Sequence, residues 1–226
     1  MTFKNREEAG RQLVDRLVQY RDDPMALILS LPRGGVAVGY QLSLGLHLPL
    51  DVFIARKLAW PDNPEYALGA VGETGTVYLN PEATTAFNLS PTDLQTLAQT
   101  QQQEIARRQS LYRQGWRLPT VTDRVVILVD DGIATGSTFF ASVQSIRHLK
   151  PRRLIGAIPV GPVETIREAR TQVDELVVLA TPDPFWAVGN HYIDFTQVSD
   201  HDVVQYLNLA EESLLEWKVR THSSTG

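Results

Sequence analysis

The stretch from Val126 to Thr138, "VILVDDGIATGST", joins an apolar run to two adjacent aspartates and then to a loop of glycine and hydroxyl residues. A short continuous apolar run that stops at turn residues is typical of a strand buried on both faces of a parallel sheet. The loop leads into a helical pattern that begins at Ser137. Backbone N–H groups converge where a small-residue loop enters a helix, so the stretch predicts an α/β fold with an anion-binding loop.

Strands and helices alternate along most of the chain. Segments that predict strands, most of them apolar runs, occur at residues 26–31, 51–58, 124–129, 153–160 and 175–181. Helical patterns occur at 34–46, 137–149 and 163–171, after an N-terminal helix that starts at Asn5. This alternation predicts an open, mainly parallel sheet with helices on both faces, which is an α/β fold.

Four further segments are expected around this core, in a single domain that spans residues 1–226. The first is rich in Trp, Pro, Asn and Gly and is predicted to be a long loop or a loose hairpin. The second is a polar helix whose thin apolar stripe places it on the surface or on a partner subunit. The third is rich in proline and aromatic residues, and the fourth is an amphipathic terminal helix. They cover about residues 59–80, 91–114, 181–199 and 200–219, in that order.

Composition narrows the class of protein. The net charge of -5 argues against nucleic acid or a membrane surface as the main partner. The absence of cysteine excludes disulfides, thiolate metal sites and a cysteine nucleophile. The N-terminus lacks the apolar core of a signal peptide and no run approaches the roughly 20 apolar residues of a membrane span, so a cytoplasmic location is expected. The histidines lack the spacing of zinc ligands.

The acidic loop predicts a ligand with two different parts. Gly132 and Gly136 let backbone N–H groups converge on a phosphate, and three hydroxyl side chains follow or separate them. A phosphate would repel Asp130 and Asp131, so these aspartates are expected to accept hydrogen bonds from neutral hydroxyls, such as a sugar diol. A phosphorylated sugar explains both parts, whereas a solvated acidic turn would explain only the aspartates. The hydroxyl donors are Thr135, Ser137 and Thr138.

This stretch resembles the phosphoribosyl diphosphate (PRPP) signature of type I phosphoribosyltransferases, and "LPRGG" at residues 31–35 resembles their pyrophosphate loop. The resemblance covers about residues 26–180. The ending "TPDPFWAVGNHYIDFTQVSDHDV" is similar to a subgroup of bacterial members whose acceptor is not established. The resemblance implies a pentosyltransferase that moves the 5-phosphoribosyl group from PRPP to a nitrogen acceptor, as in nucleotide salvage, and releases pyrophosphate.

The resemblance also implies a role for each matching residue. Asp130 and Asp131 would hold the ribose hydroxyls, while Arg33, the Gly34 backbone and Lys57 would meet the pyrophosphate. The two aspartates, Arg33 and Lys57 together form the implied catalytic group. Mg²⁺ is expected as the cofactor, bound through PRPP and water with no direct protein ligand. The implied 5′-phosphate loop comprises Gly132, Ala134, Thr135, Gly136, Ser137 and Thr138.

The resemblance also implies roles for two segments that flank the predicted site. Residues 59–80 would be a mobile lid, in which Glu73 could reach the site or lie in an ordinary hairpin turn. Residues 181–199 would be a hood over the acceptor and are called the hood segment below. Its Phe185 and Trp186 could stack on the acceptor or serve only in packing.

The acceptor is narrowed by Ala134, which occupies the position of an aspartate in enzymes for 6-oxopurines. This departure argues against hypoxanthine and guanine. It leaves a nucleobase or related heterocycle near Phe185 and Trp186, with Asp183 or Asp194 as possible polar partners.

Two rival functions stay open. A non-catalytic, PRPP-binding regulator would keep the same site, and Arg107, Arg108 and Arg113 on the polar helix could then form a basic contact face or simply be solvated charge. A sugar-phosphate hydrolase is disfavoured because no general base or metal cluster accompanies the acidic pair. A homodimer is expected, and neither nucleic acid nor a membrane is expected as a partner.

Overall fold

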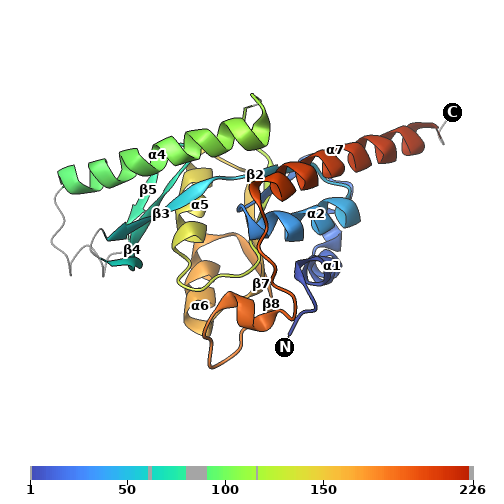
Figure 1. Ribbon diagram of the computed structural model, residues 1–226. Helices are drawn as coiled ribbons and strands as arrows, with labels where there is room; N and C mark the ends of the chain where they lie inside the picture. The colour runs from blue at the N-terminus through green and yellow to red at the C-terminus, as the bar shows by residue number, and fades with distance from the viewer. Residues whose placement is uncertain (1, 61–62, 80–90, 116, 224–226) are drawn as a thin grey trace.

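The central element of the fold is a sheet of five parallel strands in the order β2-β1-β6-β7-β8. The computed structural model describes residues 2–60, 63–79, 91–115 and 117–223 (Figure 1). The strands of this sheet are β1 (Ala26–Ser30), β2 (Leu50–Val52), β6 (Val125–Val129), β7 (Arg153–Val160) and β8 (Glu175–Ala180). Ser30 at the end of β1 lies opposite Val129 at the end of β6. The loops that follow these two strands therefore leave the sheet side by side.

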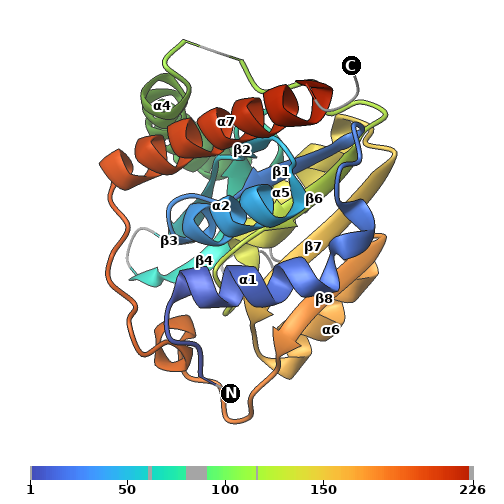
Figure 2. The same ribbon diagram turned by 90° about the vertical axis from the view of Figure 1, so that its right-hand side faces the viewer.

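Helices cover both faces of the sheet, which confirms the predicted α/β class (Figure 1, Figure 2). Ile127 and Val129 of β6 pack into the cluster with α1 and α2, whereas Val126 and Leu128 pack into the cluster with α5 and α6. Both sides of the strand are apolar because both are covered. The helices are α1 (Arg6–Arg16), α2 (Gly34–Leu46), α5 (Ser137–His148) and α6 (Val163–Gln172), with short 3-10 helices η1 (Val18–Tyr20) and η2 (Val188–His191).

A second, antiparallel sheet replaces part of the expected loop region. It contains β3 (Ala55–Trp60), β4 (Asn63–Gly72) and β5 (Val77–Leu79) in the order β3-β4-β5. The single strand predicted at 51–58 is wrong, because β2 ends at Val52 and the chain passes through the buried Phe53 and Ile54 into the other sheet. The sequence does not reveal this change of sheet, because the apolar residues from Val52 to Ala55 are buried on both sides of it.

The predicted long loop or loose hairpin at 59–80 is thus largely strand in its described part. Its glycines allow close packing that larger residues would prevent. A Cβ at Gly69 would lie 2.0 Å from the Tyr78 carbonyl oxygen, and one at Gly72 would lie 2.1 Å from the Ser145 hydroxyl on α5. Residues 61–62 and 80 of this prediction lie outside the described residues.

Two long helices complete the fold. Helix α4 (Pro91–Arg113) confirms the predicted polar helix, and its buried Ile105 and Tyr112 pack against the antiparallel sheet and α7. Helix α7 (Asp200–Ser223) is longer than predicted and lies across α2 (Figure 2). Among the described residues, no helix is both long enough and apolar enough to cross a membrane.

Candidate active site

The loop at residues 130–138 leaves the carboxyl end of β6 and enters α5. Gly136 has a φ of 74°, a left-handed conformation that glycine adopts without strain, and a Cβ there would lie 2.5 Å from Phe140. Helix α5 begins at Ser137, whose hydroxyl lies 3.3 Å from that of Thr135. The hydroxyls therefore lie beside the free N–H groups of a helix N-terminus, where an anion can bind.

The loop at residues 31–35 lies against the acidic pair. A Cβ at Gly34 would lie 1.9 Å from the Asp131 Oδ2 atom, and one at Gly35 would lie 3.0 Å from the Asp130 Cα atom. Only glycine lets the first turn of α2 approach the aspartates this closely. The structure therefore brings together the two loops that the sequence separates by about a hundred residues.

The two carboxylates of the pair have different surroundings. Asp130 accepts a hydrogen bond from the Asp131 backbone N–H at 2.9 Å, while Asp131 Oδ2 pairs with Arg6 Nε at 2.6 Å. The Tyr192 hydroxyl donates to the Asp131 carbonyl oxygen at 2.5 Å. Burial, and next the neighbouring Asp131 charge, raise the pKa of Asp130 well above its usual range. Burial also raises the pKa of Asp131, whereas the Arg6 guanidinium lowers it.

Arg6 connects the acidic pair to the hood segment. Its Nη1 atom donates to the Thr196 carbonyl oxygen at 2.8 Å, and its guanidinium lies 3.8 Å above the Phe195 ring. Sequence analysis missed Arg6 and Tyr192. Arg6 lies 125 residues from Asp131 in a helix with no motif, so no local pattern could have indicated the contact.

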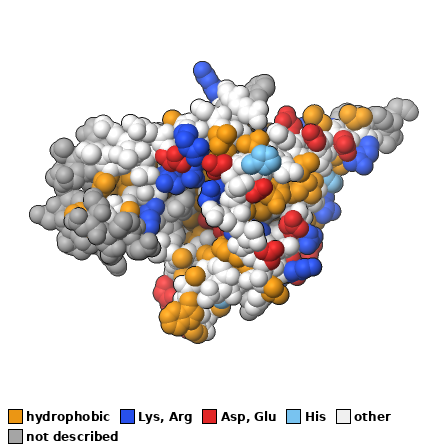
Figure 3. Space-filling model, in the orientation of Figure 1, with side chains coloured by type: hydrophobic (Ala, Val, Ile, Leu, Met, Phe, Trp, Pro, Cys, Tyr) orange, Lys and Arg blue, Asp and Glu red, His pale blue; other side chains and the backbone are white. Residues whose placement is uncertain are grey.

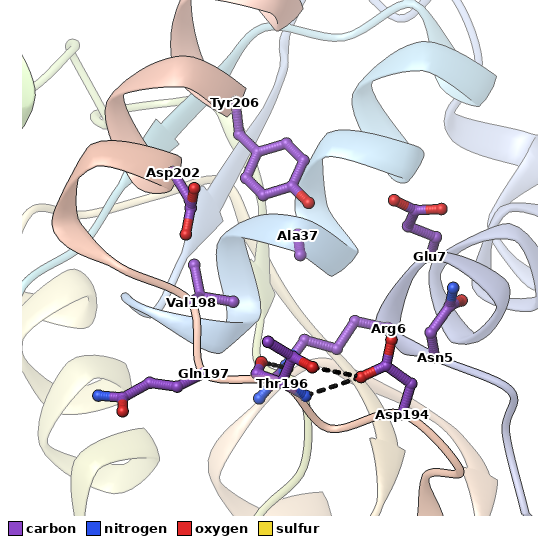
Figure 4. A pocket seen from close by; sticks show the side chains of 10 residues that line it. All are labelled: Asn5, Arg6, Glu7, Ala37, Asp194, Thr196, Gln197, Val198, Asp202 and Tyr206. Carbon is purple, nitrogen blue, oxygen red and sulfur yellow. Dashed lines mark hydrogen bonds between the residues drawn. The ribbon is translucent and has the colours of Figure 1, made fainter.

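A cavity of about 270 Å³ adjoins Arg6 between α1, α2, α7 and the hood segment. Figure 4 shows Arg6 extending below Ala37 toward Thr196, beside the hydrogen bonds that Asp194 accepts from Thr196. The cavity is lined by Asn5, Arg6, Glu7, Ala37, Asp194, Thr196, Gln197, Val198, Asp202 and Tyr206. Asp194, which the sequence suggested as a polar partner of the acceptor, thus lines this cavity and accepts hydrogen bonds from Thr196.

The aromatic residues of the hood segment are in contrasting environments. Phe185 is partly buried against Phe3 and Val160, and it stacks on His191 with a centroid distance of 5.1 Å. The Trp186 side chain is 80% exposed, and Asp183 is exposed as well. Phe185 is therefore partly committed to packing, whereas the ring of Trp186 is accessible to a ligand.

The two side chains predicted to bind pyrophosphate, Arg33 and Lys57, lie on different sheets or their connections. Arg33 precedes α2, and its Nη1 atom lies 3.8 Å from an oxygen of Asp200, which also accepts from the Tyr112 hydroxyl at 2.5 Å. Lys57 is exposed, but it lies within β3 of the antiparallel sheet. Its predicted position at the end of a parallel strand is wrong, because the run at 51–58 changes sheet before reaching it.

The arginines of α4 form ion pairs with acidic side chains. This pairing argues against the basic contact face considered for a PRPP-binding regulator. Figure 3 shows acidic and basic side chains interspersed where α4 lies beside the start of α7. Arg107 and Arg108 both pair with Glu104, at 2.8 Å each, and Arg107 also pairs with Asp200.

Arg113 and Glu73 are buried together. The Arg113 side chain is 4% exposed and pairs at 2.6 Å with Glu73, which is 2% exposed. The alternative in which Glu73 reaches the candidate site is therefore wrong, since its carboxylate is enclosed by this ion pair and by the Ile54 N–H, 3.0 Å away.

The fold and these loops have the arrangement of α/β proteins that bind phosphorylated ligands at the carboxyl edge of a parallel sheet. A family model described as the phosphoribosyl transferase domain matches residues 4–192. The chain belongs to this family of glycosyltransferase-type enzymes.

Two similar proteins support the assignment. The chain is 39% identical over 214 residues to a protein of Mycobacterium tuberculosis strain H37Rv that is provisionally named a phosphoribosyl transferase, covering 95% of this chain and 48% of the relative. The crystal structure of TT1426 from Thermus thermophilus is 37% identical, with a TM-score of 0.79 and coverage of 92% of this chain and 98% of that one. The chain spans about half the length of the curated relatives that it matches.

Proposed function

We propose that the chain is a PRPP-dependent phosphoribosyltransferase that moves the 5-phosphoribosyl group to a nitrogen acceptor and releases pyrophosphate. The observation that carries the proposal is the position of Asp130 and Asp131. They lie between the glycine-hydroxyl loop at the start of α5 and the first turn of α2, whose Gly34 touches Asp131. A ligand with a phosphate, a diol and a second anionic group matches these neighbouring features.

Each part of PRPP then has a place. The 5′-phosphate binds at the N-terminus of α5, with Gly132, Ala134, Thr135, Gly136, Ser137 and Thr138 as its loop. Asp130 and Asp131 accept hydrogen bonds from the ribose 2′- and 3′-hydroxyls. The pyrophosphate lies at the positive N-terminal end of α2, near the Gly34 backbone and Arg33, with Lys57 approaching from β3.

The transfer breaks the bond between ribose C1′ and a pyrophosphate oxygen and forms a bond between C1′ and the acceptor nitrogen, which loses a proton. The positive charge that develops on the ribose ring is offset by the nearby carboxylates, and the donors at α2 stabilise the departing pyrophosphate. The protein orients the reactants and needs no nucleophilic side chain.

Magnesium is the cofactor that we propose. The site offers hard carboxylate oxygens, which suit Mg²⁺, and PRPP offers more oxygen ligands. The ion would be held directly by PRPP and water, and the acidic pair would contact it only through them. When bound, it would neutralise the pyrophosphate.

The acceptor that we propose is a nucleobase or related heterocycle, other than a 6-oxopurine. Ala134 supplies no carboxylate at the loop, and its exposed position leaves room beside it. The exposed Trp186 ring is available for stacking, and the neighbouring Phe185 stacks on His191. The expected homodimer stays a prediction.

The test is calorimetric titration of PRPP with Mg²⁺ into the wild type and the Asp130→Asn/Asp131→Asn double variant, with Asp15→Asn on the exposed side of α1 as the control. We expect the wild type and the control to bind and the double variant to lose at least tenfold in affinity. A panel of bases is then scored by pyrophosphate release. Binding without release for any acceptor would instead favour the PRPP-binding regulator, and equal binding by the double variant would refute the site.

A further inference from the structure

Arg6 joins α1, the acidic pair and the hood segment, and we propose that it is a positioning residue of the ribose site. Its guanidinium orients the Asp131 carboxylate toward the ribose, and the same guanidinium binds the hood segment through Thr196 and Phe195. This inference rests on the proposed function, because that function assigns Asp131 to the ribose.

The backbone around Arg6 is held on both sides. Arg6 is the first residue of α1, and the Asn5 side chain before it caps the helix by accepting the Glu8 N–H at 2.9 Å. The Phe3 N–H donates to the His191 carbonyl oxygen of the hood segment at 2.8 Å. Because these bonds set where the side chain starts, the contact with Asp131 is a built feature of the fold.

The guanidinium makes directional contacts away from solvent. The Arg6 and Asp131 side chains are only 11% and 14% exposed. Nε meets Asp131, Nη1 meets the Thr196 carbonyl, and the flat face covers Phe195. A partly buried, charge-assisted contact of this kind is stronger and more specific in direction than an exposed ion pair.

The acidic pair needs such a counter-charge to bind a diol. Two adjacent buried carboxylates repel each other, and sharing a proton would occupy oxygens that the ribose hydroxyls require. Arg6 uses Oδ2 of Asp131, and the Asp131 amide uses Oδ1 of Asp130. The two carboxyls also form a side-chain hydrogen bond with each other, which the hydroxyls of the diol would replace.

The groups that face the pair come from several elements. Arg6 approaches from α1 and Tyr192 from the hood segment, whereas α2 presents the uncharged backbone of Gly34 and Gly35. Burial raises the pKa of Tyr192, so its hydroxyl stays neutral. Among the described groups that contact the pair, Arg6 is therefore the cation, and it lowers the pKa of Asp131 against the effect of burial.

The experiment compares Arg6→Gln and Arg6→Lys with Arg11→Gln, an exposed arginine of the same helix. PRPP affinity with Mg²⁺ is measured by calorimetry from pH 5.5 to 9, and urea unfolding reports whether each variant folds. We expect Arg6→Gln to bind at least tenfold more weakly at pH 7, with the midpoint of its pH dependence raised by about 1–3 units. Arg6→Lys keeps the charge, so its midpoint should stay near that of the wild type.

Two outcomes overturn the inference. A pH profile of Arg6→Gln equal to that of Arg11→Gln would mean that Arg6 only anchors α1. Tighter binding by Arg6→Gln would mean that Arg6 competes with the ribose.

A carboxyl-carbon NMR titration of the same variants separates this inference from the proposed function. A higher pKa of the acidic pair in Arg6→Gln supports the role of Arg6 even if the wild type binds no PRPP, a result that would refute only the proposed function. An unchanged titration overturns the inference.

Discussion

The buried ion cluster of Arg113, Glu73 and Asp51 joins α4 to both sheets, and replacing Arg113 with methionine should test its energy. Arg113 Nε lies 3.1 Å from Asp51, and its two terminal nitrogens lie 2.6 and 3.0 Å from Glu73. It also donates to the Val52 carbonyl oxygen at 2.6 Å. Methionine keeps an unbranched apolar stem and removes all of these donors.

The expected loss in the free energy of unfolding is about 3–5 kcal/mol at pH 8, the usual cost of leaving a buried charge without its partner. Here two carboxylates lose their common cation, and Glu73 is only 2% exposed. A typical domain, with a stability of about 5–15 kcal/mol, would survive this loss.

The loss should shrink at low pH. Burial raises the pKa of Asp51 in the folded state, and Arg113 opposes that rise. A raised folded pKa means that stability is present at low pH and is lost as pH rises through that pKa. Because Arg113→Met raises the pKa further, its deficit relative to the wild type should be smaller at pH 5 than at pH 8.

Urea unfolding at both pH values, followed by circular dichroism, measures the effect through the transition midpoint at unchanged slope. Arg147→Met is the matched control, because Arg147 pairs with Asp174 at 2.9 Å but is 37% exposed. Its expected loss is below about 1 kcal/mol. The reasoning fails if Arg113→Met loses no more than this control, or if its deficit grows as pH falls.

Three further predictions concern the candidate site and the hood segment. Gly34→Ala places a Cβ 1.9 Å from Asp131 Oδ2, so PRPP affinity measured by calorimetry should fall at least tenfold, and unchanged affinity would contradict the proposed contact. Removing Mg²⁺ with a chelator should weaken PRPP binding in the same assay, whereas binding indifferent to the ion would argue against its role at the pyrophosphate. Trp186→Ala removes a ring that is 80% exposed, so stability should change by less than about 0.5 kcal/mol, while the affinity for an acceptor should fall; undiminished acceptor affinity would remove Trp186 from the proposed site.

Much of the fold could be predicted because local patterns carry it. The run from Val126 to Val129 is apolar at every position, and the structure covers both of its faces with helices. The loop from Asp130 to Thr138 has Gly136 where the backbone enters α5, so the start of this helix could be predicted from neighbouring residues.

The errors arose where identical local patterns have different partners. Residues 51–58 are predicted as one strand, yet Val52 pairs with β1 and Ala55 pairs with β4 of the other sheet. Glu73 and Arg113 are charged residues of a turn and a polar helix, and only their mutual approach makes burial of both tolerable.

The sequence by itself determined the alternation of strands and helices, the glycine-hydroxyl loop at the start of α5 and the acidic pair, because backbone geometry and hydrophobic periodicity act over short distances along the chain. The tertiary structure alone decided that Gly34 touches Asp131, that Lys57 belongs to a second sheet and that Arg6 joins Asp131 to Thr196. These contacts depend on how distant segments pack, and a carboxylate acquires its charge state and its direction from whatever the fold brings within a few ångströms of it.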